Sequence, residues 1–285
     1  MNPTNRGILL FIASLFVATC VDAPAKYLLH QGLPLNTVVF FRYLIAFLAL
    51  ILFLVAKRER PQRSHHIGVN LLRGVLLTSS TFTNFYAVSK LSLALVVSIN
   101  FAAPLISCAL APFILKEHVG PRRWAAVLVG FIGVLIILRP GSTSFQPAMF
   151  ACLFNALLIA LFQIFTRKAG FKDDPQTGLL WVFAVGLAAS TFALPNGWQM
   201  PSASLFLIAI FMGSSGLITH YLSSQALRLA PASLIAPFQY TQLIWMTLSG
   251  IILFGDWPDH YTIIGAAIII ISGIYVWHRE RVRAV

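Results

Sequence analysis

Apolar stretches of about the length needed to cross a lipid bilayer recur along this chain from one end to the other. A helix needs roughly 20 apolar residues to span the hydrocarbon layer, and charges, prolines and glycines divide the 285 residues into ten such stretches. They run near residues 7–29, 35–56, 68–89, 92–115, 121–139, 146–168, 176–194, 202–226, 231–254 and 260–278. With 58% hydrophobic and 10% charged residues, the composition lies outside the soluble range. The sequence therefore predicts an all-α integral membrane protein that forms one membrane domain over residues 1–285.

The basic residues predict the orientation of this path. If the N-terminus is cytoplasmic, 16 of the 20 lysines and arginines fall in cytoplasmic segments, Arg42 lies inside the second helix, and the outer side holds only Lys26, Lys90 and Arg139. Such a bias is the positive-inside signal, so we expect both termini in the cytoplasm and the protein in the cytoplasmic (inner) membrane. The net charge of +12 is spread over separate short loops, which argues against a nucleic-acid partner.

The ten stretches divide into two sets of five that show a weak internal repeat. A shift of 139 residues lays residues 94–117 on residues 233–256, and it pairs Asn100 with Gln239, Phe101 with Tyr240, and Glu117 with Asp256. An odd number of helices in each half inserts the halves in opposite orientations, so we expect inverted five-helix repeats over 7–139 and 146–278. Inverted repeats of this kind are typical of secondary transporters that alternate access to a central site.

Three segments resemble the drug/metabolite transporter superfamily of the EamA type. They are "DAPAKYLL" in the first helix, "HQGLPLNTVVFFRYLIAFLAL" with Arg42 in the second, and "SLALVVSINFAAPLISCALAPFILKEHVGPRRWAAVLVGFIGVLIIL" in the fourth and fifth. The resemblance implies a ten-helix carrier of small metabolites, often an exporter, in a group that includes carriers of amino acids, S-adenosylmethionine and riboflavin. The chain departs from the pattern at "GDWPDHYT", where an aspartate replaces the usual glutamate, so equal roles for the two halves are not implied.

Asp22 is the most informative polar residue in a predicted span, because a carboxylate near a helix centre costs about 2.5–3.5 kcal/mol on insertion. Lys26 stands one turn outward in the order that favours an i,i+4 pair, and Arg42 lies at a similar depth in the next helix. Pro24 cannot donate a backbone hydrogen bond and leaves a carbonyl acceptor free. Two interpretations remain open: a structural charge cluster, or a cluster that also meets the solute or a coupled proton.

For the other polar residues in the predicted spans, the same two interpretations remain open: helix packing or solute contact. Arg42 either reaches the membrane surface or anchors a carboxylate or phosphate, buried amides either bond between helices or line a cavity, and His220 is either packed or a proton relay. The candidate substrate-binding or coupling residues are Asp22, Lys26, Arg42, Thr81, Asn84, Asn100, His220, Gln239, Tyr240, Gln242 and Trp245. Expected helix breaks are Pro24, Pro104, Pro112 and Pro237, and the helix-end acids Glu117 and Asp256 either have a gate or helix-packing role or are plainly solvated.

Motif content separates transport from other functions. The sequence has no HExxH, no G-x-S-x-G, no paired aspartates within a helix and no Walker loop, so a membrane-embedded enzyme or an ATP-driven pump lacks visible machinery. The three cysteines, Cys20, Cys108 and Cys152, lie in apolar runs without metal-ligand spacing, so we expect no metal and no cofactor.

The expected function is secondary transport by alternating access, with a small-molecule solute and the lipid bilayer as partners. Our first expectation is export of an amino acid or an amino-acid-derived zwitterion, because Asp22, Lys26 and Arg42 suit a solute with both signs of charge. The alternative is import of a nucleoside-like or flavin-like cofactor such as S-adenosylmethionine or riboflavin. Proton coupling and a homodimer are left open.

Overall fold

A computed structural model of the protein describes residues 2–58, 64, 67–116, 120–142, 145–169, 175–230 and 232–283. Within these ranges every regular element is a helix, as the sequence predicts. The elements are α1 (Pro3–His30), α2 (Leu35–Lys57), α3 (Ile67–Lys90), α4 (Leu93–Asn100), α5 (Ala102–Ile114), α6 (Pro121–Leu138), α7 (Ala148–Ala169), α8 (Pro175–Ala193), η1 (Leu194–Asn196), α9 (Ala203–Leu229), α10 (Ala232–Ile235), η2 (Ala236–Thr241), α11 (Gln242–Ser249), η3 (Gly250–Phe254) and α12 (His260–Arg283).

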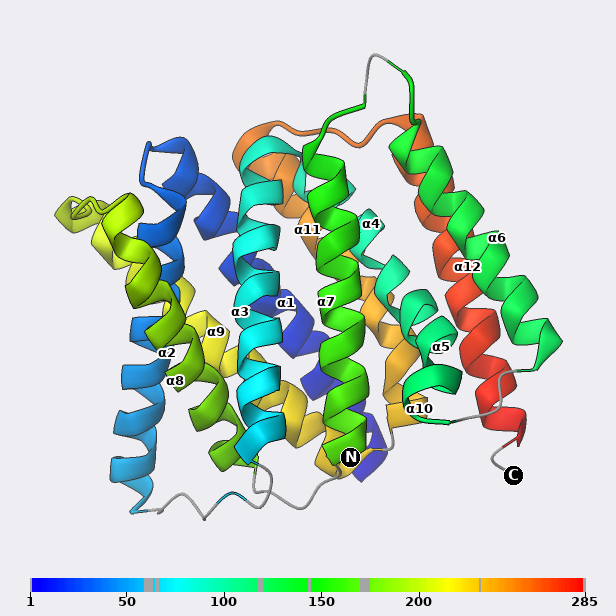
Figure 1. The fold of residues 1–285 in the computed structure, drawn as a ribbon, viewed down its shortest axis with the longest axis horizontal. Coiled ribbons are helices and arrows are strands. Elements are labelled where there is room, and N and C mark those ends of the chain that lie inside the picture. Colours follow the sequence, from blue (N-terminus) through cyan, green and yellow to red (C-terminus); the bar gives the residue numbers. More distant parts are fainter. Residues whose placement is uncertain are drawn as a thin grey trace.

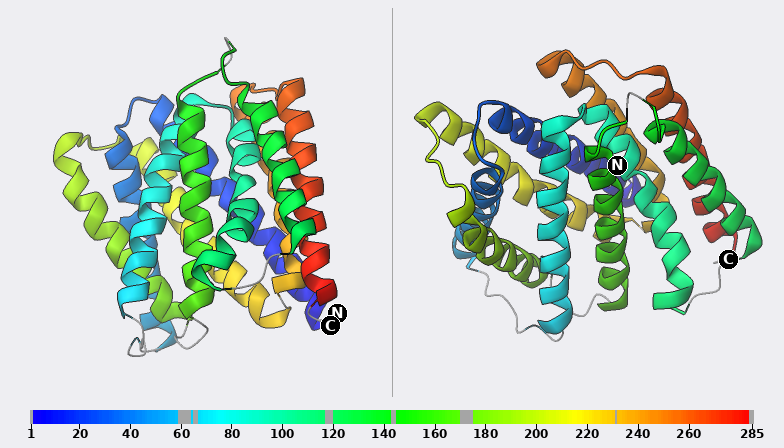
Figure 2. Two further views of the ribbon diagram at one scale, coloured as in Figure 1. Left: turned by 45° about the vertical axis from the view of Figure 1, so that its right-hand side comes forward. Right: turned by 45° about the horizontal axis from the view of Figure 1, so that its top comes forward.

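These elements cross the molecule ten times, which confirms the expected ten-helix architecture (Figure 1). α4 and α5 form one crossing, and α10, η2, α11 and η3 together form another. Both described ends of the chain lie on the same face of the bundle. α1 starts from this face, whereas α7 starts from the opposite one, so the two sets of five crossings run in opposite directions (Figure 2).

Two of the four expected helix breaks are real. Pro104 has no N–H to bond the carbonyl of Asn100, and the helix is interrupted at Phe101, between α4 and α5. Pro237 acts in the same way in the second half, where the backbone tightens into the 3₁₀ turn η2.

The other two expected breaks are wrong. Pro24 and Pro112 lie inside α1 and α5, and both helices continue past them. A proline removes one hydrogen bond and introduces a clash with the preceding turn, but both helices keep their helical assignment on either side of it.

Eight of the crossings are long and apolar enough to span a membrane by length and composition. The two that fall short are α3 and the α10–η3 crossing. α3 carries buried polar residues such as Thr81 and Ser80, and α10–η3 is divided into short pieces. Both belong to the part of the bundle that surrounds the central cavity described below.

α6 and α12 pack as a close pair at one edge of the bundle (Figures 1 and 2). A Cβ atom on Gly133 would lie 2.8 Å from the backbone oxygen of Gly265, so only glycine allows this approach, as is common between membrane helices. The Ser272 hydroxyl donates to the carbonyl of Ala126 across the same contact.

The α6–α12 pair ends in an ion pair between Arg139 and Asp259. The Asp259 carboxylate also accepts a 2.8 Å hydrogen bond from the backbone N–H of Thr262 and so caps the start of α12. Burial raises the pKa of Asp259, but the hydrogen bonds from Thr262 and the charge of Arg139 outweigh it and leave the pKa below its ordinary value. The ionised form that pairs with Arg139 is therefore the favoured one.

We expect Gly133→Ala to lower the stability of the bundle. Its new methyl group would overlap the Gly265 backbone, and overpacking of this kind costs about 1–3 kcal/mol. Thermal unfolding in detergent should show a lower midpoint than for the wild type. The control is Gly68→Ala in α3, where nothing lies within 4 Å of the added atom; equal midpoints for the two variants would contradict the close helix contact.

Candidate functional site

A cavity of about 370 Å³ lies between the two halves of the bundle. This volume is within the range of small-molecule sites, roughly 300–1,000 Å³. Its walls come from α1, α2, α3, α4, α5, α7, α9, η2 and α11. The polar lining residues are Asp22, Arg42, Ser80, Thr81, Asn84, Asn100, Asn155, Gln163, Thr219, His220, Gln239 and Gln242. A cavity with both charges and many amides can bind a polar solute by several hydrogen bonds at once.

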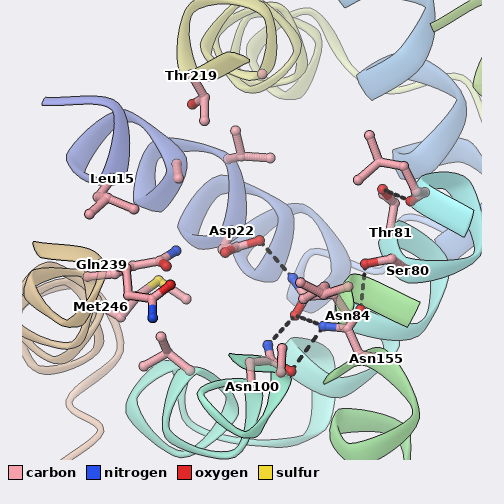
Figure 3. Close-up of a pocket in the computed structure, with 18 of the residues that line it drawn as sticks. Leu15, Asp22, Ser80, Thr81, Asn84, Asn100, Asn155, Thr219, Gln239 and Met246 are labelled. Atoms are coloured by element: carbon pink, nitrogen blue, oxygen red, sulfur yellow. Dashed lines mark hydrogen bonds between the residues drawn. The ribbon is translucent and has the colours of Figure 1, made fainter. Parts of the chain in front are cut away.

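Three asparagines from three helices form a hydrogen-bonded cluster on one wall, which we call the asparagine cluster: Asn84 of α3, Asn100 of α4 and Asn155 of α7 (Figure 3). Asn155 Nδ2 donates to Asn100 Oδ1 (3.0 Å) and to Asn84 Oδ1 (3.3 Å), and Asn100 Nδ2 donates to Asn84 Oδ1 (3.2 Å). Ser80 donates to Asn155 Oδ1 at 2.6 Å. The cluster ties one crossing of the second half to two of the first.

The asparagine cluster ends at Asp22. Asn84 Nδ2 donates to Asp22 Oδ1 at 2.9 Å. An ionised carboxylate only accepts hydrogen bonds, so Asn84 must present its amide nitrogen to Asp22 and its oxygen to the other two asparagines. Asn155 and Asn100 therefore both donate to Asn84, and Asn84 in turn donates to Asp22. The second carboxylate oxygen accepts no hydrogen bond from the residues that the structure describes, which leaves it available to a solute.

Arg42 enters the cavity from α2 and has few partners of its own. Only 7% of the residue is exposed, yet Nε and Nη1 are buried without a hydrogen-bond partner in the described part of the chain. Its guanidinium lies 4.7 Å from the centre of the Tyr43 ring. Tyr43 is fixed in turn by a 2.9 Å hydrogen bond between its hydroxyl and Thr81 Oγ1. No ion pair joins Arg42 to Asp22 among the described side chains.

Gln239 and Met246 lie across the cavity from the asparagine cluster, with Asp22 between the two walls (Figure 3). Gln239 belongs to η2, and Gln242 follows at the start of α11. His220 lines the cavity from α9, and its ring meets Phe183 edge-on at 5.8 Å. This second wall is less constrained than the first and combines amide groups with apolar surface.

Lys26 does not line the cavity and does not pair with Asp22, although the i,i+4 spacing suggested that pair. Its Nζ donates to the Leu91 carbonyl at 3.0 Å and pairs with Asp256, while the Phe254 ring lies 4.8 Å away. Only 4% of Lys26 is exposed. Lys26 bonds the Leu91 carbonyl and the Asp256 carboxylate instead of Asp22, and both of these acceptors lie on other segments of the chain. We call Lys26, Leu91, Phe254 and Asp256 the Lys26 cluster; it lies at the end of the bundle opposite the chain termini.

The helix-end acids have different outcomes. Asp256 is ion-paired in the Lys26 cluster, with its side chain 31% exposed, so it is not simply solvated. Glu117 lies outside the described residues.

Tyr240 and Trp245 do not line the cavity either. The Tyr240 ring packs edge-on against Phe101 at 5.1 Å, and its hydroxyl fills the space beside Gly273. The Trp245 ring meets Phe16 edge-on at 5.3 Å. The 3₁₀ winding of η2 has about three residues per turn instead of 3.6, so residues after Pro237 face directions that a regular helix does not predict.

Four polar lining residues escaped the sequence reasoning: Ser80, Asn155, Gln163 and Thr219. Asn155 is 1% exposed and stands in the apolar run "CLFNALLIALFQIF", which also holds Gln163. A buried amide in such a run was the signal that singled out Asn100. The same signal would have found Asn155.

Comparison with known proteins adds the family. The profile of the EamA-like transporter family matches residues 5–139 and 146–277. The chain is 29% identical over 283 residues to an S-adenosylmethionine uptake transporter of Rickettsia bellii, covering 99% of this chain and 96% of that protein. It is 28% identical over 289 residues to a riboflavin transporter of Vibrio cholerae, with coverage of 99% and 96%.

A solved crystal structure shares the fold. It superposes with a TM-score of 0.65 and 16% sequence identity, covering 94% of this chain and 95% of that one. The two family matches together span nearly the whole chain, in agreement with the resemblance to the drug/metabolite transporter superfamily. The chain belongs to the EamA-like transporter family.

Proposed function

We propose that the protein is a secondary carrier that imports a nucleoside-like or flavin-like metabolite across the cytoplasmic membrane by alternating access. The observation that carries the proposal is the polar cavity between two oppositely oriented halves, with a partly buried ion pair at one end. The relatives named for S-adenosylmethionine uptake and for riboflavin support this reading. They give no support to our first expectation, export of an amino acid.

We take the orientation in the membrane from the basic residues, which predict cytoplasmic termini. With both termini in the cytoplasm, the Lys26 cluster lies on the outer side, because it is at the opposite end of the bundle. The cavity extends toward the cytoplasmic side as far as Phe11 on α1 and Gln163 on α7. We infer that the Lys26 cluster closes the cavity toward the outside in the described conformation.

The cavity lining suits a solute with a flat ring system. Phe11, Phe85 and Phe101 contribute aromatic surface, and Met246 contributes an adaptable apolar side chain. Amide groups of the asparagine cluster, Gln239 and Gln242 can bond the edge of a heterocycle. Apolar walls with a few placed polar groups are the usual composition of a ligand site.

We infer that η3 and Gly255 form a hinge beside the Lys26 cluster. η3 is a single π-helical turn, a feature that often marks a functional site, and it ends at Gly255, whose φ of 70° lies in the left-handed region. Asp256 follows directly and holds Lys26 of α1. Separation of Asp256 from Lys26 would open the cavity outward while the rest of the bundle keeps its contacts.

We expect purified protein in proteoliposomes to exchange labelled S-adenosylmethionine or riboflavin in a counterflow assay, run with and without a pH gradient. Exchange should saturate, because a carrier has a finite number of sites. The control is Asp22→Asn, which should reach liposomes normally but lose most exchange. If folded protein exchanged neither compound and instead carried a simple amino acid, the proposal would be overturned.

We expect loss of the Lys26–Asp256 pair to open the cavity to the outside. For this test Cys20, Cys108 and Cys152 are replaced and Ala18, which lines the cavity, is changed to Cys. A membrane-impermeant thiol reagent added outside should label Lys26→Met roughly tenfold faster or more, because loss of this partly buried ion pair disfavours the state that contains it.

The matched control for this experiment is Arg139→Gln, which removes a different ion pair of the described residues, between α6 and α12. It should leave the labelling rate unchanged. Equal rates for Lys26→Met and the parent would show that this pair does not close the outer side.

We expect Asn84→Leu to lower uptake by about tenfold or more, because a hydrogen bond to a charged group contributes about 1.5–3 kcal/mol. The variant keeps the side-chain size but leaves Asp22 without its donor. Asn36→Leu is the control, since Asn36 bonds the Ala193 carbonyl (2.9 Å) at the outer end of α2. Uptake is measured at equal membrane levels, and wild-type uptake by Asn84→Leu would mean that Asp22 needs no positioning.

A further inference from the structure

The guanidinium of Arg42 is a buried charge whose hydrogen-bonding capacity is unfilled. Arg42 is 7% exposed, lines the cavity, and has two nitrogens, Nε and Nη1, without a partner among the described residues. Buried charges are normally paired, because removal of a charge from water is costly unless an opposite charge and hydrogen bonds compensate. A ligand that brings an acceptor would meet this requirement.

None of the acidic side chains in the described part of the structure forms an ion pair with Arg42. Asp256 pairs with Lys26, and Asp259 pairs with Arg139. Asp22 accepts from Asn84 and makes no ion pair with Arg42 in the described part of the bundle. The cavity thus presents a carboxylate and a guanidinium as separate groups.

The orientation of Arg42 is fixed by its neighbours. Its guanidinium lies over the Tyr43 ring at 4.7 Å, and the Tyr43 hydroxyl bonds Thr81 at 2.9 Å. The same ring packs directly on Gly186 of α8, where a Cβ atom would lie 2.2 Å from it. Arg42 therefore approaches the cavity from a rigid support, and a positioned guanidinium matches the two oxygens of a carboxylate.

The charge of the cavity favours a carboxylate over a phosphate. Arg42 is the single lysine or arginine among the described lining residues, and Asp22 brings a negative charge to the same space. A phosphate monoester carries a charge of about −1.5 to −2 at neutral pH and would exceed this positive charge. A solute with one carboxylate and one cationic group balances both side chains.

The geometry points to Arg42 as the residue that binds the carboxylate of the solute, with Asp22 binding a cationic amine, so that the imported metabolite carries an amino-acid group. This inference rests on the proposed import of a nucleoside-like or flavin-like metabolite and narrows it. S-adenosylmethionine has a carboxylate and an ammonium, which form an amino-acid group joined to a nucleoside through a sulfonium, whereas riboflavin has none of these charges. Arg42 and Asp22 then select the first kind of solute against the second.

The test compares unlabelled competitors against labelled S-adenosylmethionine in proteoliposomes. One competitor is S-adenosylmethionine itself; the other is its decarboxylated analogue, which keeps the amine and the sulfonium. The wild type should bind the decarboxylated analogue roughly tenfold more weakly or worse, because the charge-assisted bonds to Arg42 are lost. In Arg42→Gln the preference for S-adenosylmethionine over the decarboxylated analogue should shrink several-fold relative to the wild type, because the guanidinium charge and its paired hydrogen bonds to the carboxylate are lost.

The matched control is Arg73→Gln. Arg73 is a half-buried arginine, which bonds Asn70 Oδ1 at 2.9 Å and does not belong to the cavity lining. This variant should keep the wild-type preference for the carboxylate. The wild-type comparison requires no variant, so it decides the question even if Arg42→Gln does not reach the membrane.

Three results would overturn the inference, and they are distinguishable. Equal competition by the two compounds in the wild type shows that no residue binds the carboxylate of the solute. Exchange of riboflavin without competition from S-adenosylmethionine would contradict the inference that the solute carries an amino-acid group, but it would agree with the proposed import. Absence of exchange for both solutes by folded protein overturns the proposed import together with this inference.

Discussion

The carboxylate of Asp22 inside the membrane is the constraint on which the rest of the structure depends. A charge at this depth must be hydrated or hydrogen-bonded, since its insertion costs several kcal/mol. Asn84 meets part of this need directly, and Asn100 and Asn155 hold Asn84 in the orientation that donates to Asp22. Because these asparagines come from three helices, the hydrogen bonds that lead to Asp22 also join α3, α4 and α7 beside α1.

Two charged groups on one helix have separate roles. Asp22 and Lys26 stand one turn apart on α1, but Asp22 turns toward the cavity and Lys26 toward the outer end of the bundle. α1 therefore lines the cavity and also joins the Lys26 cluster. A small rotation or tilt of this helix would change both together, as the proposed alternating access requires.

The sequence was sufficient for the number of crossings and for much of the cavity, because apolar length and isolated polar residues are local signals. It placed Asp22, Arg42 and Asn100 correctly among polar groups within the bundle. It failed for Lys26, whose acidic partner lies 230 residues away, since spacing along one helix says nothing of contacts between the halves. It also misjudged Tyr240, because the pitch of the helix changes locally at η2.

The unfilled hydrogen-bonding capacity of Arg42 has a consequence for the resting carrier. A polar space of this size between a guanidinium, a carboxylate and several amides is a favourable place for water, which bonds unsatisfied buried groups. Solute entry is then an exchange in which water leaves and the solute must reproduce its hydrogen bonds. Among metabolites of similar shape, a solute that does not restore the hydrogen bonds of the displaced water binds more weakly. The affinity for each solute is therefore set relative to the hydrated cavity.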